Sequence, residues 1–137
     1  MKRTIETSHK LNANPEKVWE QISKASGVNE WLPIVTSCSL HGNKRVCTTE
    51  QGDLKETILK IDNKSKVFKY AINEQPLLPV QNVVGTMRVI SQDESTELLW
   101  NMDFEIEDES NLPMIQQAVE DLYKAGASGL ETISQGK

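Results

Sequence analysis

The feature of this sequence that most limits its fold is a change in the spacing of apolar residues at about residue 113. Upstream, apolar and polar side chains alternate in successive segments, the pattern of β-strands that bury one face. Downstream, residues 113–133 carry apolar side chains every three to four positions, as an amphipathic α-helix does. We therefore predict one long terminal helix preceded by strands near 34–40, 45–50, 54–61, 66–73, 82–91 and 96–106.

A further strand and two short helices are predicted at the start of the chain. Residues 4–11 alternate as a strand. Asn14 is suited to cap a helix whose first position is Pro15. We expect this helix to end at Gly27, and a second short helix to cover 28–31.

The terminal helix decides how these elements pack. Its apolar face is predicted to contain Ile115, Ala118, Val119, Leu122, Ala125, Gly126, Gly129 and Ile133. A long helix that follows seven antiparallel strands can bury such a face only across the concave side of a strongly curved sheet. The predicted fold class is therefore α+β: a helix-grip arrangement in which residues 1–137 form a single domain. Trp100, Met102 and Phe104 of the last strand should face the helix.

Charge and composition argue against several classes of function. Fifteen basic against twenty acidic side chains give a net charge of −5, whereas proteins that bind nucleic acid or anionic membranes through overall charge are basic. No apolar run approaches the ~20 residues of a membrane span, and the first residues lack a signal peptide's apolar stretch. We expect a cytoplasmic protein that neither binds nucleic acid nor inserts into a membrane.

The sequence also lacks the short motifs of common catalytic classes. It contains no HExxH, no GxSxG, no glycine-rich phosphate loop and no zinc-type cysteine spacing. We therefore predict neither a metal nor a cofactor, and metal hydrolase, serine hydrolase and nucleotide-dependent activities have no support.

The two cysteines are predicted to lie opposite each other. If Gly42 and Asn43 form a two-residue hairpin loop, Cys38 and Cys47 occupy a non-hydrogen-bonded pair of the hairpin. They are then either two reduced, small apolar side chains on one face of the sheet or a redox or metal pair. With this turn, mild oxidation is expected to join them without unfolding the protein.

Several short motifs resemble one known family over nearly the whole chain. Residues 13–19 read ANPEKVW, similar to the family's "a-x-P-E-x-V-W", and residues 31–33 read WLP, similar to "W-x-P". Further matches in order and spacing are residues 42–45, 54–56, 62, 70–72, 79–82 and 96–100. The family is the START-like (SRPBCC) superfamily, and within it the polyketide cyclase/dehydrase-type proteins, with the birch-pollen-allergen-like and abscisic-acid-receptor proteins more distant.

The resemblance implies a ligand site between the sheet and the long helix. By matching motifs, its lining would comprise Glu56, Tyr70, Ile72, Val83, Gly85, Met87, Trp100, Val119, Leu122 and Gly126. Loops 49–53 and 74–81 correspond to the family's entrance loops. The expected function is binding or transport of a small hydrophobic or amphipathic molecule, such as a lipid, an isoprenoid or an aromatic metabolite. The alternatives are a polyketide cyclase/aromatase-like enzyme and a chaperone-activator-like interaction module, and the sequence predicts no oligomeric state.

Three features of the predicted site leave alternatives open. Glu56 either points inward, where burial would raise its pKa and suit it to orient a ligand or act as an acid, or is an exposed carboxylate paired with Arg45 or Lys69. The missing side chain of Gly126 either leaves room for the cavity or lets the helix pack closely on large residues. His9 is expected to be a hydrogen-bonded structural residue, with a possible role in orienting the ligand.

Overall fold

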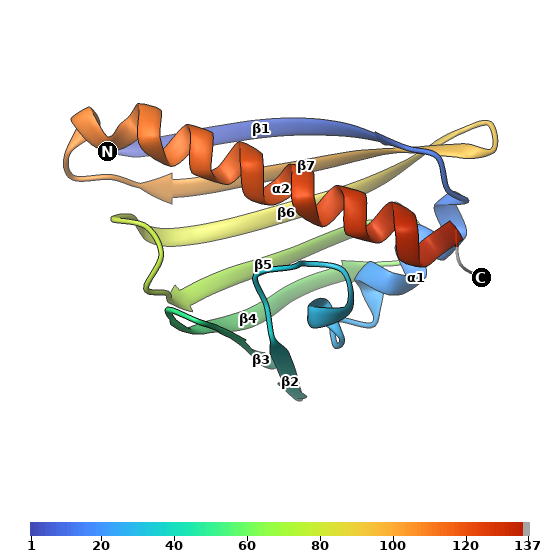
Figure 1. Cartoon of the computed structure of the whole chain (residues 1–137), viewed down its shortest axis with the longest axis horizontal. Helices are drawn as coiled ribbons and strands as arrows, with labels where there is room; N and C mark the ends of the chain where they lie inside the picture. The colour runs from blue at the N-terminus through green and yellow to red at the C-terminus, as the bar shows by residue number, and fades with distance from the viewer. Residues whose placement is uncertain (136–137) are drawn as a thin grey trace.

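Residues 1–135 are described by a computed structural model, in which seven strands form one antiparallel sheet (Figure 1). The strands are β1 (Lys2–Leu11), β2 (Ser37–His41), β3 (Lys44–Thr49), β4 (Gly52–Asp62), β5 (Val67–Glu74), β6 (Gln81–Gln92) and β7 (Ser95–Glu105). The helices are α1 (Pro15–Ser23), α2 (Leu112–Gln135) and the short 3-10 helices η1 (Val28–Glu30) and η2 (Glu109–Asn111). Neighbouring strands follow the order β1-β7-β6-β5-β4-β3-β2.

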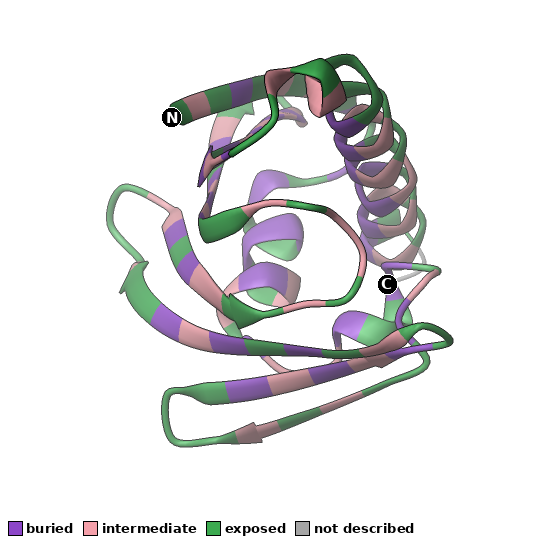
Figure 2. Ribbon diagram, turned by 90° about the vertical axis from the view of Figure 1, so that its left-hand side faces the viewer, coloured by how far each residue is buried: buried purple, intermediate pink, exposed green. Residues whose placement is uncertain are grey.

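The sheet is curved, and α2 lies across its concave side (Figure 2). Most core side chains come from this inner face, from α1 and from the buried stripe of α2. Trp100, Met102 and Phe104 of β7 are all buried, so the predicted register of that strand is confirmed. The predicted helix-grip fold, with its two short helical segments between the first two strands, is likewise confirmed.

The start of α1 follows from its first three residues. The Asn14 side-chain oxygen accepts a hydrogen bond from the Glu16 backbone N–H at 2.8 Å, and Pro15 occupies a position that needs no donor. The helix ends at Ser23, four residues before the predicted end at Gly27. The chain turns earlier because Ala25 adopts a left-handed conformation, with φ 64°, in addition to the left-handed Gly27.

The buried stripe of α2 is rotated relative to the predicted one. Its buried residues are Ile115, Val119, Tyr123, Gly126, Ala127, Leu130 and Ser134, whereas Leu122 and Ile133 are only half-buried. The cause is the Tyr123 ring, which stacks on Trp100 with ring centroids 4.0 Å apart and planes inclined by 7°. Among residues 1–135, no helix is long and apolar enough to cross a membrane.

Candidate functional site

An interior cavity, called the main cavity below, lies between the inner face of the sheet, α2 and the loop 75–80. Larger and more open hollows, of about 360, 490 and 580 Å³, lie elsewhere on the protein. The volume of the main cavity is about 70 Å³. The predicted lining residues that border it are Glu56, Tyr70, Ile72, Val83, Trp100, Val119 and Leu122. Those that the sequence-based prediction missed include Leu32, Leu54, Met102 and Tyr123. Apart from Glu56, Gln75 and the polar tips of the aromatic side chains, this lining is apolar.

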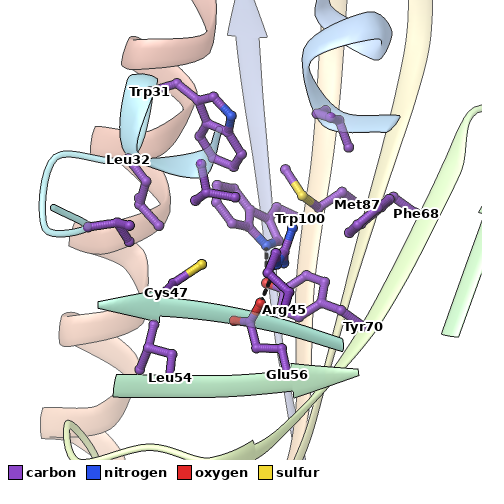
Figure 3. A pocket seen from close by; sticks show the side chains of 13 residues that line it. Trp31, Leu32, Arg45, Cys47, Leu54, Glu56, Phe68, Tyr70, Met87 and Trp100 are labelled. Atoms are coloured by element: carbon purple, nitrogen blue, oxygen red, sulfur yellow. Dashed lines mark hydrogen bonds and ion pairs between the residues drawn. The ribbon is translucent and has the colours of Figure 1, made fainter. Parts of the chain in front are cut away.

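A small cavity of about 30 Å³ adjoins the main cavity on the side of α1 and η1, and Figure 3 shows the side chains that line it. Met87, which was predicted for the ligand site, borders this small cavity instead. Five residues border both cavities and form the wall between them: Leu32, Leu54, Glu56, Tyr70 and Trp100. The two spaces are therefore neighbouring parts of one interior region.

Two glycines predicted to line the ligand site pack against aromatic rings instead. A Cβ atom added at Gly85 would lie 2.2 Å from the Tyr70 ring, and one added at Gly126 would lie 2.8 Å from the Trp100 ring. Gly129 approaches the backbone carbonyl that follows η1, where a Cβ would lie 1.9 Å from the oxygen. The volume missing at these glycines is thus filled by neighbouring atoms, which corrects the hypothesis that Gly126 leaves space for the cavity.

A buried ion pair forms the polar centre of the site. Arg45 on β3 and Glu56 on β4 are direct cross-strand neighbours, and Arg45 Nε donates to Glu56 Oε1 at 2.6 Å (Figure 3). Each residue is only 6% exposed. Arg45 Nη1 also donates to the Ala25 carbonyl oxygen at 2.8 Å, and its guanidinium lies 5.4 Å from the Phe68 ring centroid.

This ion pair combines the two alternatives considered for Glu56, because the carboxylate points inward and is also paired with Arg45. Burial raises the pKa of the Glu56 carboxyl, and the charge and hydrogen bond of Arg45 oppose that rise. Within residues 1–135, Glu56 Oε2 receives no hydrogen bond, so this oxygen can accept one from a ligand. The alternation that places Cys47 inside also places Arg45 inside, and this was the signal that sequence reasoning overlooked.

Tyr70 supplies the second polar group. Its hydroxyl oxygen accepts a hydrogen bond from Trp100 Nε1 at 3.0 Å and also interacts with the Tyr123 hydroxyl. Burial, together with the negative charge of Glu56, raises the pKa of Tyr70 to about 12. The phenol is therefore neutral at physiological pH and can act as a hydrogen-bond donor.

The loop 75–80 covers the main cavity and is held by its own first residue. Gln75 Oε1 accepts from the backbone N–H groups of Leu77 at 2.7 Å and Leu78 at 2.8 Å, while Gln75 Nε2 donates to the Leu78 carbonyl oxygen at 2.7 Å. Leu77, Leu78 and Val80 then point into the cavity lining. The loop thus lies over the main cavity, within the segment 74–81 that the resemblance assigns to an entrance loop, and entry of a ligand there stays a prediction.

His9 lies away from both cavities, so it does not orient a ligand there. Its Nε2 is 2.9 Å from Thr7 Oγ1 on the same strand, which fits the structural role predicted for it. Burial lowers the pKa of His9. Among residues 1–135, no group of three or more histidine, cysteine, aspartate or glutamate side chains could hold a metal ion.

Comparison with known proteins relates this architecture to one family. The family model described as polyketide cyclase / dehydrase and lipid transport matches residues 2–135. No curated protein sequence matches the chain.

Solved structures share the fold at low sequence identity. An uncharacterised protein from Bacillus thuringiensis is 23% identical, with a TM-score of 0.80, over 93% of this chain and 98% of its own. The ZhuI aromatase/cyclase from Streptomyces sp. R1128 is 16% identical, with a TM-score of 0.79, over 98% and 94%. Norcoclaurine synthase from Thalictrum flavum, in complex with dopamine and hydroxybenzaldehyde, is 15% identical, with a TM-score of 0.78, over 97% and 86%.

Proposed function

This chain belongs to the polyketide cyclase / dehydrase and lipid transport family, and we propose that it binds a small hydrophobic or amphipathic molecule in its main cavity. Burial of the ligand's apolar surface would supply most of the affinity, at roughly 25 cal/mol per Å². Glu56 Oε2 and the Tyr70 hydroxyl would orient a polar group of the ligand, the first as an acceptor and the second as a donor.

The observation that carries this proposal is an inward-pointing carboxylate, one oxygen of which lies at the main cavity without a hydrogen-bond partner among residues 1–135. Glu56 Oε1 has such a partner in Arg45, whereas no donor among residues 1–135 reaches Oε2. A ligand hydroxyl or amine in the main cavity would supply the missing donor.

The size of the cavity implies that the ligand enters by displacing the loop 75–80. A volume of about 70 Å³ is below the ~150 Å³ that accommodates benzene and far below the ~300 Å³ of a typical small ligand pocket. Within residues 1–135, the hydrogen bonds of residues 76–80 stay inside the loop, so it can swing outward without breaking the sheet. The apolar contacts of Leu77, Leu78 and Val80 with the cavity wall would be lost, together with the packing of Pro76 beside Gly52.

Dye binding to matched variants tests this proposal. We expect Leu122→Trp, which adds volume at the cavity lining, to abolish the fluorescence increase of an environment-sensitive apolar dye. Leu59→Trp makes the same change at a side chain that is 51% exposed, and it should leave dye binding unchanged. Equal dye binding by the wild type and both variants, or no binding by the wild type, would refute a ligand site in this cavity. If the dye results support the site, native mass spectrometry of the purified protein would identify any metabolite that it carries.

A second candidate function, favoured by the same two polar groups, is a polyketide cyclase-like enzyme. Cyclisation next to a carbonyl needs a positioned proton donor or acceptor in a dry cavity, and Glu56 and Tyr70 both border the main cavity. With a linear poly-β-ketone as substrate, Tyr70→Phe should abolish formation of the absorbing aromatic product while dye binding persists. Absence of product with the wild type would reject the enzyme and leave the binding function intact.

A further inference from the structure

The β2–β3 hairpin holds two thiols in contact. Cys38 and Cys47 are direct cross-strand partners, and Gly42 and Asn43 form the two-residue loop between the strands, as predicted. Gly42 adopts the left-handed conformation that such a loop requires, with φ 62°. Counted outward from the pair His41 and Lys44, the cysteines occupy a non-hydrogen-bonded site.

This site has the geometry of a cross-strand disulfide. Cα atoms of a non-hydrogen-bonded antiparallel pair lie about 4.5 Å apart, inside the range of roughly 4.4–6.8 Å that disulfides span. The two Sγ atoms are 3.6 Å apart, with Cys47 donating to Cys38, so both side chains already point toward each other. Only a small rotation about the Cα–Cβ bonds separates them from the bonding distance of about 2.05 Å.

We propose that Cys38 and Cys47 are a reversible oxidation site, at which a small-molecule disulfide converts the two thiols into an intramolecular bond. The Cys38 thiolate attacks the oxidant's disulfide and releases one thiol, leaving a mixed disulfide on Cys38. Cys47 then loses its proton and attacks the Cys38 sulfur, releasing the second thiol. Two protein thiols are oxidised, one disulfide is reduced to two thiols, and no further reagent is needed.

The different exposure of the two thiols sets this order of events. Cys38 is half-buried on the edge strand β2, so it is the sulfur that an oxidant can reach, whereas Cys47 is 1% exposed. Burial and the nearby charge of Glu56 raise the pKa of Cys47, which makes the second step the slower one. Cys47 borders the small cavity, so the bond would also fix one part of that cavity's wall. This inference stands independently of the proposed ligand.

Oxidation of the folded protein by glutathione disulfide tests the proposal. The wild type should lose two titratable thiols and 2 Da of mass while its circular dichroism stays unchanged, and dithiothreitol should reverse both changes. Peptide mapping should identify the Cys38–Cys47 link at every protein concentration tested. Cys47→Ser should stop at the mixed disulfide on Cys38, and Cys38→Ser should keep its buried thiol.

Three results would overturn the proposal. The first is a folded wild type that keeps both thiols free under conditions in which Cys47→Ser forms the mixed disulfide. The second is a bond that appears only after the protein is unfolded with urea. The third is a cross-link between two molecules, recognised by its dependence on protein concentration.

Discussion

Arg45→Met and Glu56→Leu, made singly and together, test how the buried ion pair contributes to stability. Each single change leaves one charge inside the protein without its counter-charge, which typically costs about 3–5 kcal/mol. After Glu56→Leu the guanidinium keeps the Ala25 carbonyl and the face of Phe68, but it loses its 2.6 Å contact with a carboxylate. We therefore expect each variant to lose about 3–5 kcal/mol of its free energy of unfolding at pH 7.

The double variant should be far more stable than the sum of the two losses predicts. Replacing a buried pair by apolar residues of similar volume is often neutral or stabilising by about 1–4 kcal/mol. This gain is opposed by the Ala25 carbonyl, which loses its Arg45 donor and costs about 1–3 kcal/mol as an unpaired buried acceptor. The two effects nearly cancel, so the double variant should lie within about 2 kcal/mol of the wild type.

The pH dependence of the two single variants should differ. In Arg45→Met, the remaining Glu56 has a folded-state pKa above its ordinary value of 4.5, because burial opposes its charge and Arg45 no longer compensates. Such a group contributes stability that is present below the unfolded pKa and is lost as the pH rises through the folded pKa. The loss in Arg45→Met should therefore shrink toward pH 4.5. In Glu56→Leu the guanidinium stays charged and the titrating carboxyl is gone, so the free energy of unfolding of this variant should lack the pH dependence that Glu56 gives the other proteins.

Urea denaturation of the four proteins at 25 °C measures these differences, provided that their m-values agree. The reasoning fails if the losses of the two single variants add in the double variant, because additive losses would mean that the two side chains do not interact. It also fails if either single variant loses less than about 1 kcal/mol, since the remaining charge would then be solvated rather than buried.

Other predictions concern packing and titration. Trp100→Ala should cost about 3–5 kcal/mol in chemical denaturation, and a loss below about 1 kcal/mol would mean that the indole is not buried. Gly126→Leu should lower the thermal midpoint, because its side chain would collide with the Trp100 ring, and an unchanged or higher midpoint would restore the cavity hypothesis for this glycine. The pKa of His9, measured by NMR, should lie below its ordinary value of 6.5 because the ring is partly buried. The stability that His9 contributes is then present above pH 6.5 and is lost as the pH falls through the folded pKa. A titration midpoint at or above 6.5 would contradict this burial.

The strands could be predicted closely because their signal is local. Alternation and turn residues located every strand of the meander to within about three residues at either end, and the spacing around Gly42 placed the cysteines opposite each other. The start of α1 could also be predicted from neighbouring residues, because the N-cap Asn14 and the following Pro15 define it. The end of α1 could not be predicted in this way, since no sequence signal marks the left-handed conformation of Ala25.

The polar and aromatic parts of the site depend on contacts between distant segments. Alternation gives Arg45 an inward position, but the cost of burying a guanidinium argues against it unless a carboxylate lies directly opposite. That partner is set by the β3–β4 register, which pairs Arg45 with Glu56. The rotation of α2 depends in the same way on Tyr123 stacking on Trp100. The spacing of apolar residues alone placed Leu122 on the buried face, because it does not count the partly polar ring of Tyr123 as a core residue.

The wall shared by the two cavities has a consequence for how this scaffold can change its specificity. Its five residues come from β4, β5, β7 and the segment after η1, and the largest of their side chains is Trp100. Shortening such a side chain would merge two small chambers into one long channel and leave every strand pairing intact. The length of a ligand that the proposed site could hold would therefore be set by a few side chains, and single substitutions among them could change it without rebuilding the sheet.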